Sequence, residues 1–208
     1  MLSASVFSEL ALSILAAYLI GSIPIAALVS RVRGVDIFST GTGLAGAANV
    51  LRNVGYVEGL VVFTGDALKG ILAIVVASWL GISGEAILIP ALATLAGHWK
   101  PFLTKFRGGD GLSPLVGITI AVVPLFGLLA VVTGGAVAGI ANLAGRHASV
   151  WGGIAGYGFL LVQAPFTQVD ITTVLGIVAL ALAVMTHGII GHRRRAGGQE
   201  SQNALIES

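Results

Sequence analysis

The sequence predicts an all-α integral membrane protein with seven transmembrane helices. Of its 208 residues, 56% are hydrophobic and only 10% are charged, whereas soluble domains carry about 25% charged residues. Several apolar runs approach the roughly 20 residues that a helix needs to cross a bilayer. So many apolar side chains cannot be buried inside one soluble globule, and the mean hydropathy of +0.97 supports this conclusion.

The composition also excludes some chemistry. The chain has no cysteine, so neither disulfide bonds nor cysteine-ligated metals are possible, and we expect neither a metal nor a cofactor. The first ten residues, MLSASVFSEL, carry Glu9 and no basic leader. We therefore expect the first apolar run to be a retained span and not a cleaved signal peptide.

The apolar runs divide the chain into seven expected spans. In order they are residues 10–30, 57–80, 86–103, 112–127, 128–144, 149–165 and 172–191. The boundary between the fourth and fifth is the weakest, since AVVPLFGLLAVV could form one kinked helix. We expect a single seven-span domain over residues 1–195, followed by a polar cytoplasmic tail at 196–208.

The distribution of basic residues predicts the orientation of the spans. Seven spans place the segments 31–56, 100–111, 145–148 and 192–208 on the same side of the membrane. These segments hold ten of the eleven Lys and Arg residues, all except Lys69. The positive-inside rule puts that side in the cytoplasm, with the N-terminus outside and the C-terminus inside. A six-span arrangement would divide the cations between the two sides.

The segment GTGLAGAANVLRN follows the first span and combines glycines with polar side chains. Gly41, Gly43 and Gly46 allow positive φ angles and close approach of the backbone to a ligand. AANVLRNV can begin a short helix whose free N–H groups favour an anion, and its Asn49 and Arg52 share a helical face. The alternative interpretation is a flexible linker followed by an interfacial helix.

A second glycine-containing loop, GHWKPFLTKFRGGDGLSP, follows the third span. Its Lys105 and Arg107 precede Gly108 and Gly109, and two cations beside a glycine turn can hold a phosphate. The segment is not a Walker loop, which would require GKS or GKT. The alternative is a positively charged loop that contains a turn.

Two further polar segments lie at span ends on the basic side. GRHASVWGG contains Arg146, His147 and Ser149, and THGIIGHRRR contains Thr186 and His187. A snorkelling cation or a structurally satisfied histidine would explain either segment alone. Together with the two loops, they predict a polar pocket at the cytoplasmic interface that is rich in anion-binding groups.

Asp66 and Lys69 lie inside the second span, on one face of the helix. Ionisable residues within a span are costly and are normally paired or turned inward. We therefore expect an ion pair that faces the bundle interior, with either a structural role or a contact with substrate.

In order and spacing, these motifs resemble those of the bacterial acyl-phosphate:glycerol-3-phosphate acyltransferase family. GTGLAGAANVLR is similar to the family's GSGNxGATNVxR, and GHWKPFLTKFRGGDG to its GHxxPxFxxFKGGKG. GSIPIA, DALKG and GRHASVWG also resemble family landmarks. The resemblance covers about residues 15–195. It implies seven spans in the bacterial inner membrane, with the active site facing the cytoplasm.

The resemblance also implies a reaction. A fatty acyl phosphate gives its acyl group to the 1-hydroxyl of glycerol 3-phosphate, forming lysophosphatidic acid and phosphate in phospholipid synthesis. The expected partners are these two substrates and membrane lipids. No nucleic acid partner is expected, and the sequence does not identify protein partners. The H-x4-D motif of the other main class of glycerol-phosphate acyltransferases is absent.

The resemblance assigns roles to individual positions. His187 would orient or deprotonate the attacking hydroxyl. The catalytic set it implies is His187, Arg52 and Ser149. The substrate phosphate-binding set it implies is Thr42, Gly43, Gly46, Asn49, Lys105, Arg107, Gly108 and Gly109.

Four positions depart from the family motifs: Leu44, Ala48, Asp110 and Ile190 replace Asn, Thr, Lys and Asn. Each change removes a polar donor, and Asp110 also adds a negative charge. The alternative function is therefore a catalytically altered or inactive paralogue that acts as a membrane binding or assembly subunit. A small transporter is a third hypothesis, with little support because the charges gather at one face and no inverted repeat is evident.

Overall fold

The computed structural model describes the backbone of residues 4–144 and 148–206, and the surroundings of side chains 6–144 and 148–191. Regular structure in these ranges is entirely helical, as predicted. The α-helices are α1 (Ala4–Gly21), α2 (Ile25–Val32), α3 (Ala47–Asn53), α4 (Tyr56–Trp79), α5 (Leu88–Trp99), α6 (Leu112–Val122), α7 (Pro124–Leu143), α8 (Ala148–Gln163) and α9 (Ile171–Ile206). Short 3₁₀ helices are η1 (Gly84–Ile87), η2 (Phe102–Thr104) and η3 (Ala164–Phe166).

Within the described chain, five segments are long and apolar enough to cross a membrane. They are Val6–Val32, Tyr56–Trp79, Gly84–Thr104, Pro124–Leu143 and Ile171–Gly191. Helix α6 is apolar but shorter, and α8 has 16 residues. The prediction of a helical membrane protein is thereby confirmed.

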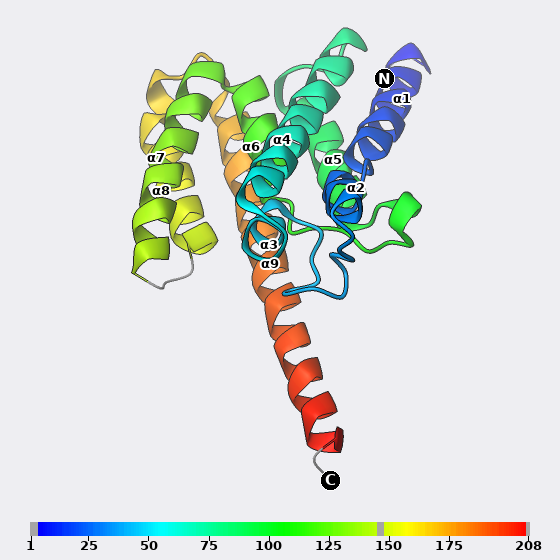
Figure 1. Ribbon diagram of the computed structural model, residues 1–208. Coiled ribbons are helices and arrows are strands. Elements are labelled where there is room, and N and C mark those ends of the chain that lie inside the picture. The colour runs from blue at the N-terminus through cyan, green and yellow to red at the C-terminus, as the bar shows by residue number, and fades with distance from the viewer. Residues whose placement is uncertain (1–3, 145–147, 207–208) are drawn as a thin grey trace.

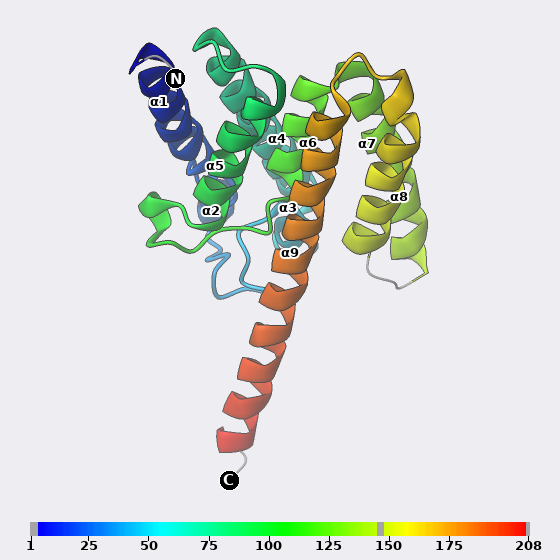
Figure 2. The same ribbon diagram turned by 180° about the vertical axis from the view of Figure 1, so that it is seen from behind.

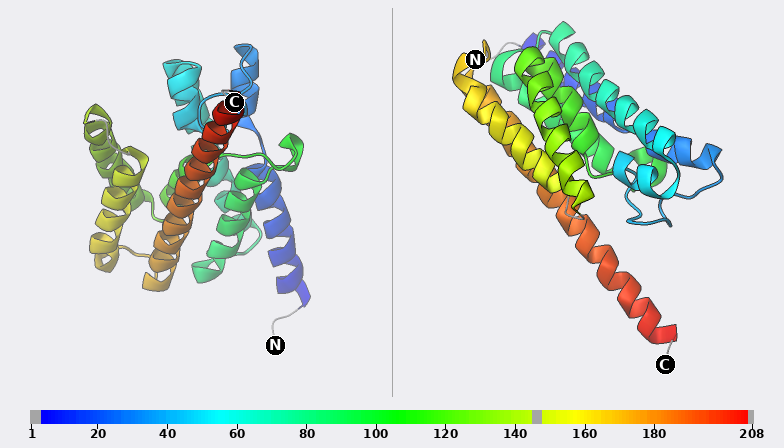
Figure 3. Two further views of the ribbon diagram at one scale, coloured as in Figure 1. Left: turned by 90° about the horizontal axis from the view of Figure 1, so that it is seen from below. Right: turned by 60° about the vertical axis from the view of Figure 1, so that its left-hand side comes forward.

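The long helices run roughly along one direction (Figure 1). Helices α7 and α8 form a hairpin on one flank, α1 and α5 pack together on the other, and α4, α6 and α9 lie between them (Figure 2). The N- and C-terminal ends lie at opposite ends of the bundle. Residues 196–206, within the expected polar tail, continue α9 well beyond the bundle (Figure 3).

The first predicted span, 10–30, is not one continuous helix. Helix α1 ends at Gly21, and α2 begins at Ile25, directly after Pro24. Proline has no N–H to donate and disrupts a helix interior. The break frees the carbonyl of Ile23, which accepts a hydrogen bond from Lys69 Nζ at 3.0 Å. A broken helix is tolerated at membrane depth where such partners exist.

The boundary between α6 and α7 differs from the predicted division at 127/128. It falls at Val123, and Pro124 opens α7 in the first-turn position where its missing N–H costs nothing. Gly127 packs against α6, since a Cβ there would approach the Thr119 carbonyl oxygen to 2.7 Å. The segment therefore forms two helices that pack against each other and not one kinked helix.

Small residues let the helices approach closely. A Cβ on Gly70 would overlap the carbonyl of Pro114, and one on Gly117 would overlap that of Ala67. Gly134 and Gly152 make the same kind of contact between α7 and α8. Close packing at glycine is a common basis of helix association in membranes.

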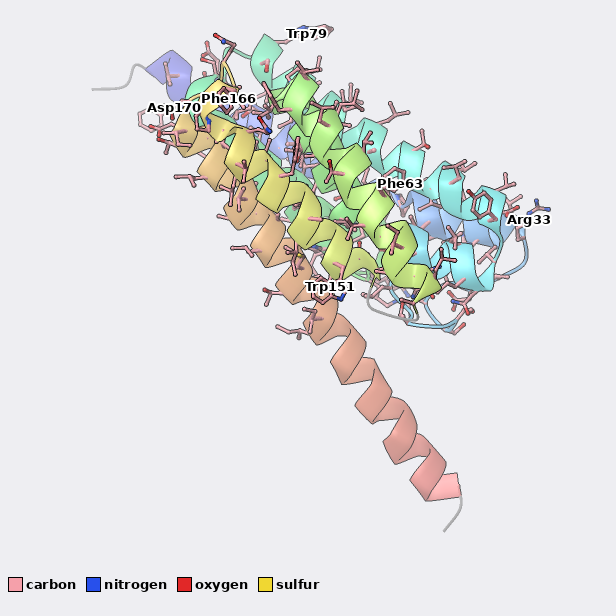
Figure 4. All side chains as sticks on the ribbon, turned by 90° about the vertical axis from the view of Figure 1, so that its left-hand side faces the viewer. Arg33, Phe63, Trp79, Trp151, Phe166 and Asp170 are labelled. Carbon is pink, nitrogen blue, oxygen red and sulfur yellow. The ribbon has the colours of Figure 1, made fainter. Side chains whose placement is uncertain are left out.

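The two ends of the bundle differ in charge. Figure 4 shows Trp79, Phe166 and Asp170 toward one end and Arg33 toward the other. Hydrogen bonds from the side chain and backbone of Thr172 lower the pKa of Asp170, which caps the start of α9. The end that carries Arg33 is also the end at which the polar loops gather (Figure 1).

Candidate active site

The first loop, residues 36–46, is shaped by one buried side chain. Asn49 is 3% exposed, and its Nδ2 donates to the carbonyls of Thr40 and Leu44, each at 3.0 Å. Its Oδ1 accepts from the Thr42 N–H at 3.2 Å and from Asn53 Nδ2 at 2.9 Å. Asn49 therefore acts mainly on the shape of the loop, although it also lines the cavity described below.

The glycines of this loop differ in their backbone conformation. Gly41 and Gly43 have φ angles of 56° and 59°, as predicted. The prediction is wrong for Gly46, whose φ is −129° because this residue is the extended N-cap of α3. The short helix expected at AANVLRNV is present as α3.

The second loop, residues 100–111, is joined to the first through its glycine turn, Gly108–Gly109. The Ala45 N–H donates to the Gly108 carbonyl at 3.1 Å, and the Gly109 N–H donates to the His98 carbonyl at 3.2 Å. A Cβ on Gly108 would overlap the carbonyls of His98 and Trp99. The turn therefore requires residues without side chains, and it fixes the two loops relative to each other.

A cavity of about 590 Å³, the main cavity, lies where the first loop, α3 and α9 meet the ends of α6, α7 and α8. Of the residues predicted to form the site, five line it: Thr42, Gly46, Asn49, Arg52 and Ser149. Ser149 lies about 100 positions after the other four residues in the sequence, so the fold brings together two of the predicted polar segments.

Other predicted site residues do not line the main cavity. Gly43 is buried in the first loop, and Lys105 is exposed, with a left-handed φ of 54°. The Arg107 guanidinium lies 4.4 Å from the centre of the Phe38 ring, in a cation–π contact. Gly108 and Gly109 border a much smaller space beside His98. Arg146 and His147 lie outside the described residues.

His187 does not line the main cavity, although it directly precedes a residue that does. Its ring stacks on Trp99 with centroids 4.9 Å apart, and it interacts with the backbone of Gly109 and the charge of Asp110. The next residue, Gly188, lines the cavity. The structure thus places His187 next to the glycine turn.

The departures from the family motifs change the cavity wall. Leu44 is 7% exposed and lines the cavity under Gly191 of α9. Asp110 also lines it, and its Oδ1 accepts the Leu112 N–H at 3.0 Å at the start of α6. Ala48 is a further wall residue, whereas Ile190 is 45% exposed. The wall therefore carries a carboxylate at the position where the motif that this loop resembles has Lys.

Three ionisable side chains, Asp66, Lys69 and His98, form a cluster that we call the buried triad. Lys69 Nζ lies 2.8 Å from Asp66 Oδ1 and 2.9 Å from His98 Nδ1. All three side chains are buried: Asp66 is 1% exposed, Lys69 4% and His98 5%. The inward-facing ion pair is confirmed. The sequence did not predict the contact between Lys69 and His98, because only tertiary packing brings α4 and α5 together here. Across the described residues, no group of three or more His, Asp or Glu side chains is placed to hold a metal ion.

Two apolar grooves adjoin the main cavity. One, of about 240 Å³, lies between α3, α4 and α6, and the other, of about 180 Å³, lies between α6, α7 and α8. Leu112 and Ser149 border all three spaces. Phe63, labelled in Figure 4, borders both grooves. A chamber whose wall includes Arg52, Asp110 and other polar side chains, and which adjoins apolar grooves, suits a ligand with a polar head and an apolar tail.

Fold and site together define a helical membrane protein with a chamber for an amphiphilic ligand at one end of its bundle. The sequence profile of the glycerol-3-phosphate acyltransferase family matches residues 11–196. The chain belongs to this family, as its motifs had indicated.

Individual relatives agree with this assignment. Glycerol-3-phosphate acyltransferase 1 of Deinococcus radiodurans is 46% identical over 118 residues, 56% of this chain and 59% of the relative. The enzyme of Dechloromonas aromatica is 41% identical over 121 residues, 58% of this chain and 61% of the relative. These matches span less than two thirds of either relative. The match to the Thermoanaerobacter sp. (strain X514) enzyme is broader, at 34% identity over 85% of this chain and 87% of that protein.

The fold also resembles that of PlsY (YgiH), described as an integral membrane glycerol 3-phosphate acyltransferase. Its glycerol 3-phosphate form superposes with a TM-score of 0.69 at 26% identity, covering 96% of this chain and 94% of that chain. Its lysophosphatidic acid form gives a TM-score of 0.67 at 26% identity, covering 96% and 93%.

Proposed function

We propose that this protein is an acyl-phosphate-dependent glycerol-3-phosphate acyltransferase that makes lysophosphatidic acid for phospholipid synthesis. One observation carries the proposal: the main cavity combines Arg52, Thr42 and the nearby His187 with direct access to two apolar grooves. Both substrates bear phosphate, and one also bears a long acyl chain. The relatives named glycerol-3-phosphate acyltransferase and the two PlsY forms support glycerol 3-phosphate as the acceptor and lysophosphatidic acid as the product.

Each part of the site has a role in this proposal. Arg52 pairs with a substrate phosphate through its planar guanidinium, while Thr42 and the first loop border the phosphate. Ser149, at the junction of the cavity and both grooves, lies beside the acyl phosphate headgroup. The acyl chain occupies a groove and continues toward the bilayer.

The reaction is an acyl transfer. The 1-hydroxyl oxygen of glycerol 3-phosphate attacks the acyl carbon, and the bond from that carbon to the phosphate oxygen breaks. The phosphate leaves with the bonding electrons. His187 orients the hydroxyl, takes its proton and passes it to the departing phosphate. The acyl phosphate is already activated, so positioning contributes much of the rate.

A second candidate function is favoured by Asp110 and Leu44. A carboxylate on the cavity wall repels the phosphates, and a leucine in place of asparagine removes a donor. Under this alternative, the protein is an altered or inactive paralogue that serves as a membrane binding or assembly subunit.

The two candidates are separated by measuring turnover. Purified protein in detergent is given glycerol 3-phosphate with either acyl phosphate or acyl-CoA, and phosphate or free thiol release is followed. Release from acyl phosphate only, lowered in Arg52→Ala at substrate concentrations below the KM, supports the enzyme. Absence of release with a catalytically active relative run in parallel would contradict it and favour the paralogue.

We also propose that α6 and α8 are membrane crossings, which gives seven in all, with the N-terminus outside and the C-terminus in the cytoplasm of a bacterial inner membrane. Opposite ends of the bundle carry the two termini, and Arg33 lies far from Asp170. This arrangement agrees with the positive-inside rule. It places the main cavity on the cytoplasmic side.

The absence of cysteine makes this topology simple to test. Ser39→Cys in the first loop and Ser83→Cys before η1 introduce single thiols at exposed positions. In intact cells, a membrane-impermeant maleimide is expected to label Cys at position 83 only. Labelling at position 39 without permeabilisation would contradict the orientation.

A further inference from the structure

Lys69 joins three parts of the protein through one buried ammonium group. Its Nζ lies 2.8 Å from Asp66 Oδ1, 3.0 Å from the Ile23 carbonyl oxygen and 2.9 Å from His98 Nδ1. An ammonium has three N–H donors, so these partners from α4, the α1–α2 break and α5 use all of them. Lys69 therefore holds Asp66, the Ile23 carbonyl and His98 together.

The contact with Lys69 also determines which way His98 presents its proton. Since Lys69 donates to Nδ1, that nitrogen accepts and the proton is on Nε2. The Nε2 side of the ring faces the glycine turn, where a Cβ on Gly109 would overlap both His98 Nε2 and the Ala45 carbonyl oxygen. His98 is thus held by Lys69 on one side and packs against the turn on the other.

The glycine turn is held between two histidines. The Gly109 N–H donates to the His98 carbonyl at 3.2 Å, while His187 interacts with the Gly109 backbone from α9. Through the Ala45–Gly108 hydrogen bond, the turn also fixes the end of the first loop. A displacement of His98 would therefore move both His187 and the loop that bears Thr42.

We propose that Lys69 and His98 are positioning residues, which act on the reaction by fixing the glycine turn and, through it, His187 and the first loop. Neither residue lines the main cavity. Stability alone is a weak explanation for a buried ion pair, because desolvation offsets its attraction. This inference rests on the proposed function for its kinetic test, but it also predicts a structural change that needs no turnover.

The variants separate a loss of positioning from the effect of leaving one charge of the buried ion pair without its partner. Lys69→Met alone leaves Asp66 buried and unpaired, so the informative variant is Asp66→Asn/Lys69→Met, which removes both charges. His98→Leu removes the contact with the turn, and His98→Gln retains an acceptor and a donor. Thr94→Val is the matched control, since Thr94 is buried on α5 and its hydroxyl bonds only within that helix, to Pro90.

Two measurements are made on each variant. The first is the KM for glycerol 3-phosphate together with kcat. The second is the emission spectrum and acrylamide quenching of Trp99, which donates to the Asp110 carbonyl at 2.8 Å and so reports on the turn. Changing Trp79 and Trp151 to Phe leaves Trp99 as the sole tryptophan of the chain.

We expect Asp66→Asn/Lys69→Met and His98→Leu to raise the KM about tenfold or more, as loss of one well-placed hydrogen bond does. Both variants also increase quenching of Trp99. His98→Gln recovers part of each effect, and Thr94→Val changes neither. A purely structural role would lower the active fraction, seen as a lower apparent kcat, and leave the KM and Trp99 quenching at wild-type values.

The outcomes remain distinct if the wild-type protein shows no turnover. That result would contradict the proposed function, and Trp99 quenching alone would then test whether Lys69 and His98 position the glycine turn. Wild-type quenching in both the double variant and His98→Leu would overturn it. Failure of the double variant to fold leaves the decision with His98→Leu and His98→Gln, which change no charge in the ion pair.

Discussion

Trp99 and His187 stack with their ring centroids 4.9 Å apart and their planes inclined by 26°. The same indole donates to the Asp110 carbonyl at 2.8 Å. One side chain of α5 therefore fixes both the histidine of α9 and the backbone of the residue that carries the unusual carboxylate. The relation joins α5 to α9 directly beside Asp110 and Gly188, two residues that line the main cavity.

His187→Ala is expected to lower kcat by about 100-fold or more, in the range typical of a lost general acid–base group. The neighbouring Thr186→Ala serves as the control, because its exposed hydroxyl bonds only to the Leu182 carbonyl of its own helix. Initial rates of phosphate release measure both. Equal rates in His187→Ala and wild type would remove His187 from the mechanism.

Arg52→Ala removes the cation that lines the main cavity. Loss of a charged hydrogen bond costs about 1.5–3 kcal/mol, so the KM for a phosphorylated substrate should rise about 10- to 100-fold. Arg31→Ala is the control, since Arg31 is an exposed cation of α2 outside the cavity. If both variants show the same small change, Arg52 contributes only to the general positive charge of this face.

Asp110→Asn is expected to lower the KM for glycerol 3-phosphate. The asparagine retains an oxygen that can accept the Leu112 N–H while removing the negative charge from the cavity wall. Asp110→Lys, which restores the family residue, should lower the KM further, and both gains should shrink in high salt. A higher KM in Asp110→Asn would show that the carboxylate takes part in substrate binding.

Asn49→Ala should disorder the first loop without creating a clash. The carbonyls of Thr40 and Leu44 lose the bonds from the Asn49 amide and keep only those from the N–H groups of Gly43 and Gly46. Each lost hydrogen bond costs about 0.5–1.5 kcal/mol. We expect a lower unfolding temperature and weaker substrate binding. Ser39→Ala, in the same loop but exposed, is the control. An unfolding temperature equal to wild type would contradict the role of Asn49 in shaping the loop.

Gly117→Ala tests the close packing of α4 on α6. The new Cβ would overlap the Ala67 carbonyl, and overpacking of this kind costs about 1–3 kcal/mol. In Gly139→Ala on α7, the Cβ meets no atom within 4 Å, so higher helix propensity should leave stability equal or slightly increased. Thermal unfolding in detergent compares the two, and equal stability would show that α4 and α6 can separate to accept the methyl group.

Much of the fold was predictable because membrane crossing imposes length and composition on each helix. The predicted helix boundaries differ most from the structure where a proline interrupts an apolar run. Pro24 ends the continuity of the first span, and Pro124 opens α7 four residues before the predicted division. A hydropathy pattern alone gives little information on such breaks, because the residues on both sides are equally apolar.

The site was predictable as a set of segments but not as a set of side chains. The positive-inside pattern places the loops on one side, and the motifs identify the glycines. Only packing shows that Arg107 stacks on Phe38 while Arg52 lines the cavity. The link from Lys69 to His98 likewise joins residues 29 positions apart on different helices, and no local pattern encodes it.

The central claim, acyl transfer from acyl phosphate to glycerol 3-phosphate, is tested most directly by product stoichiometry. Purified protein in lipid vesicles is given acyl phosphate and radiolabelled glycerol 3-phosphate, and lysophosphatidic acid and phosphate are both quantified. The account predicts equal amounts of the two products, with both reduced in Arg52→Ala at substrate concentrations below the KM. Phosphate release without labelled lysophosphatidic acid, or no product at all beside an active relative, would contradict it.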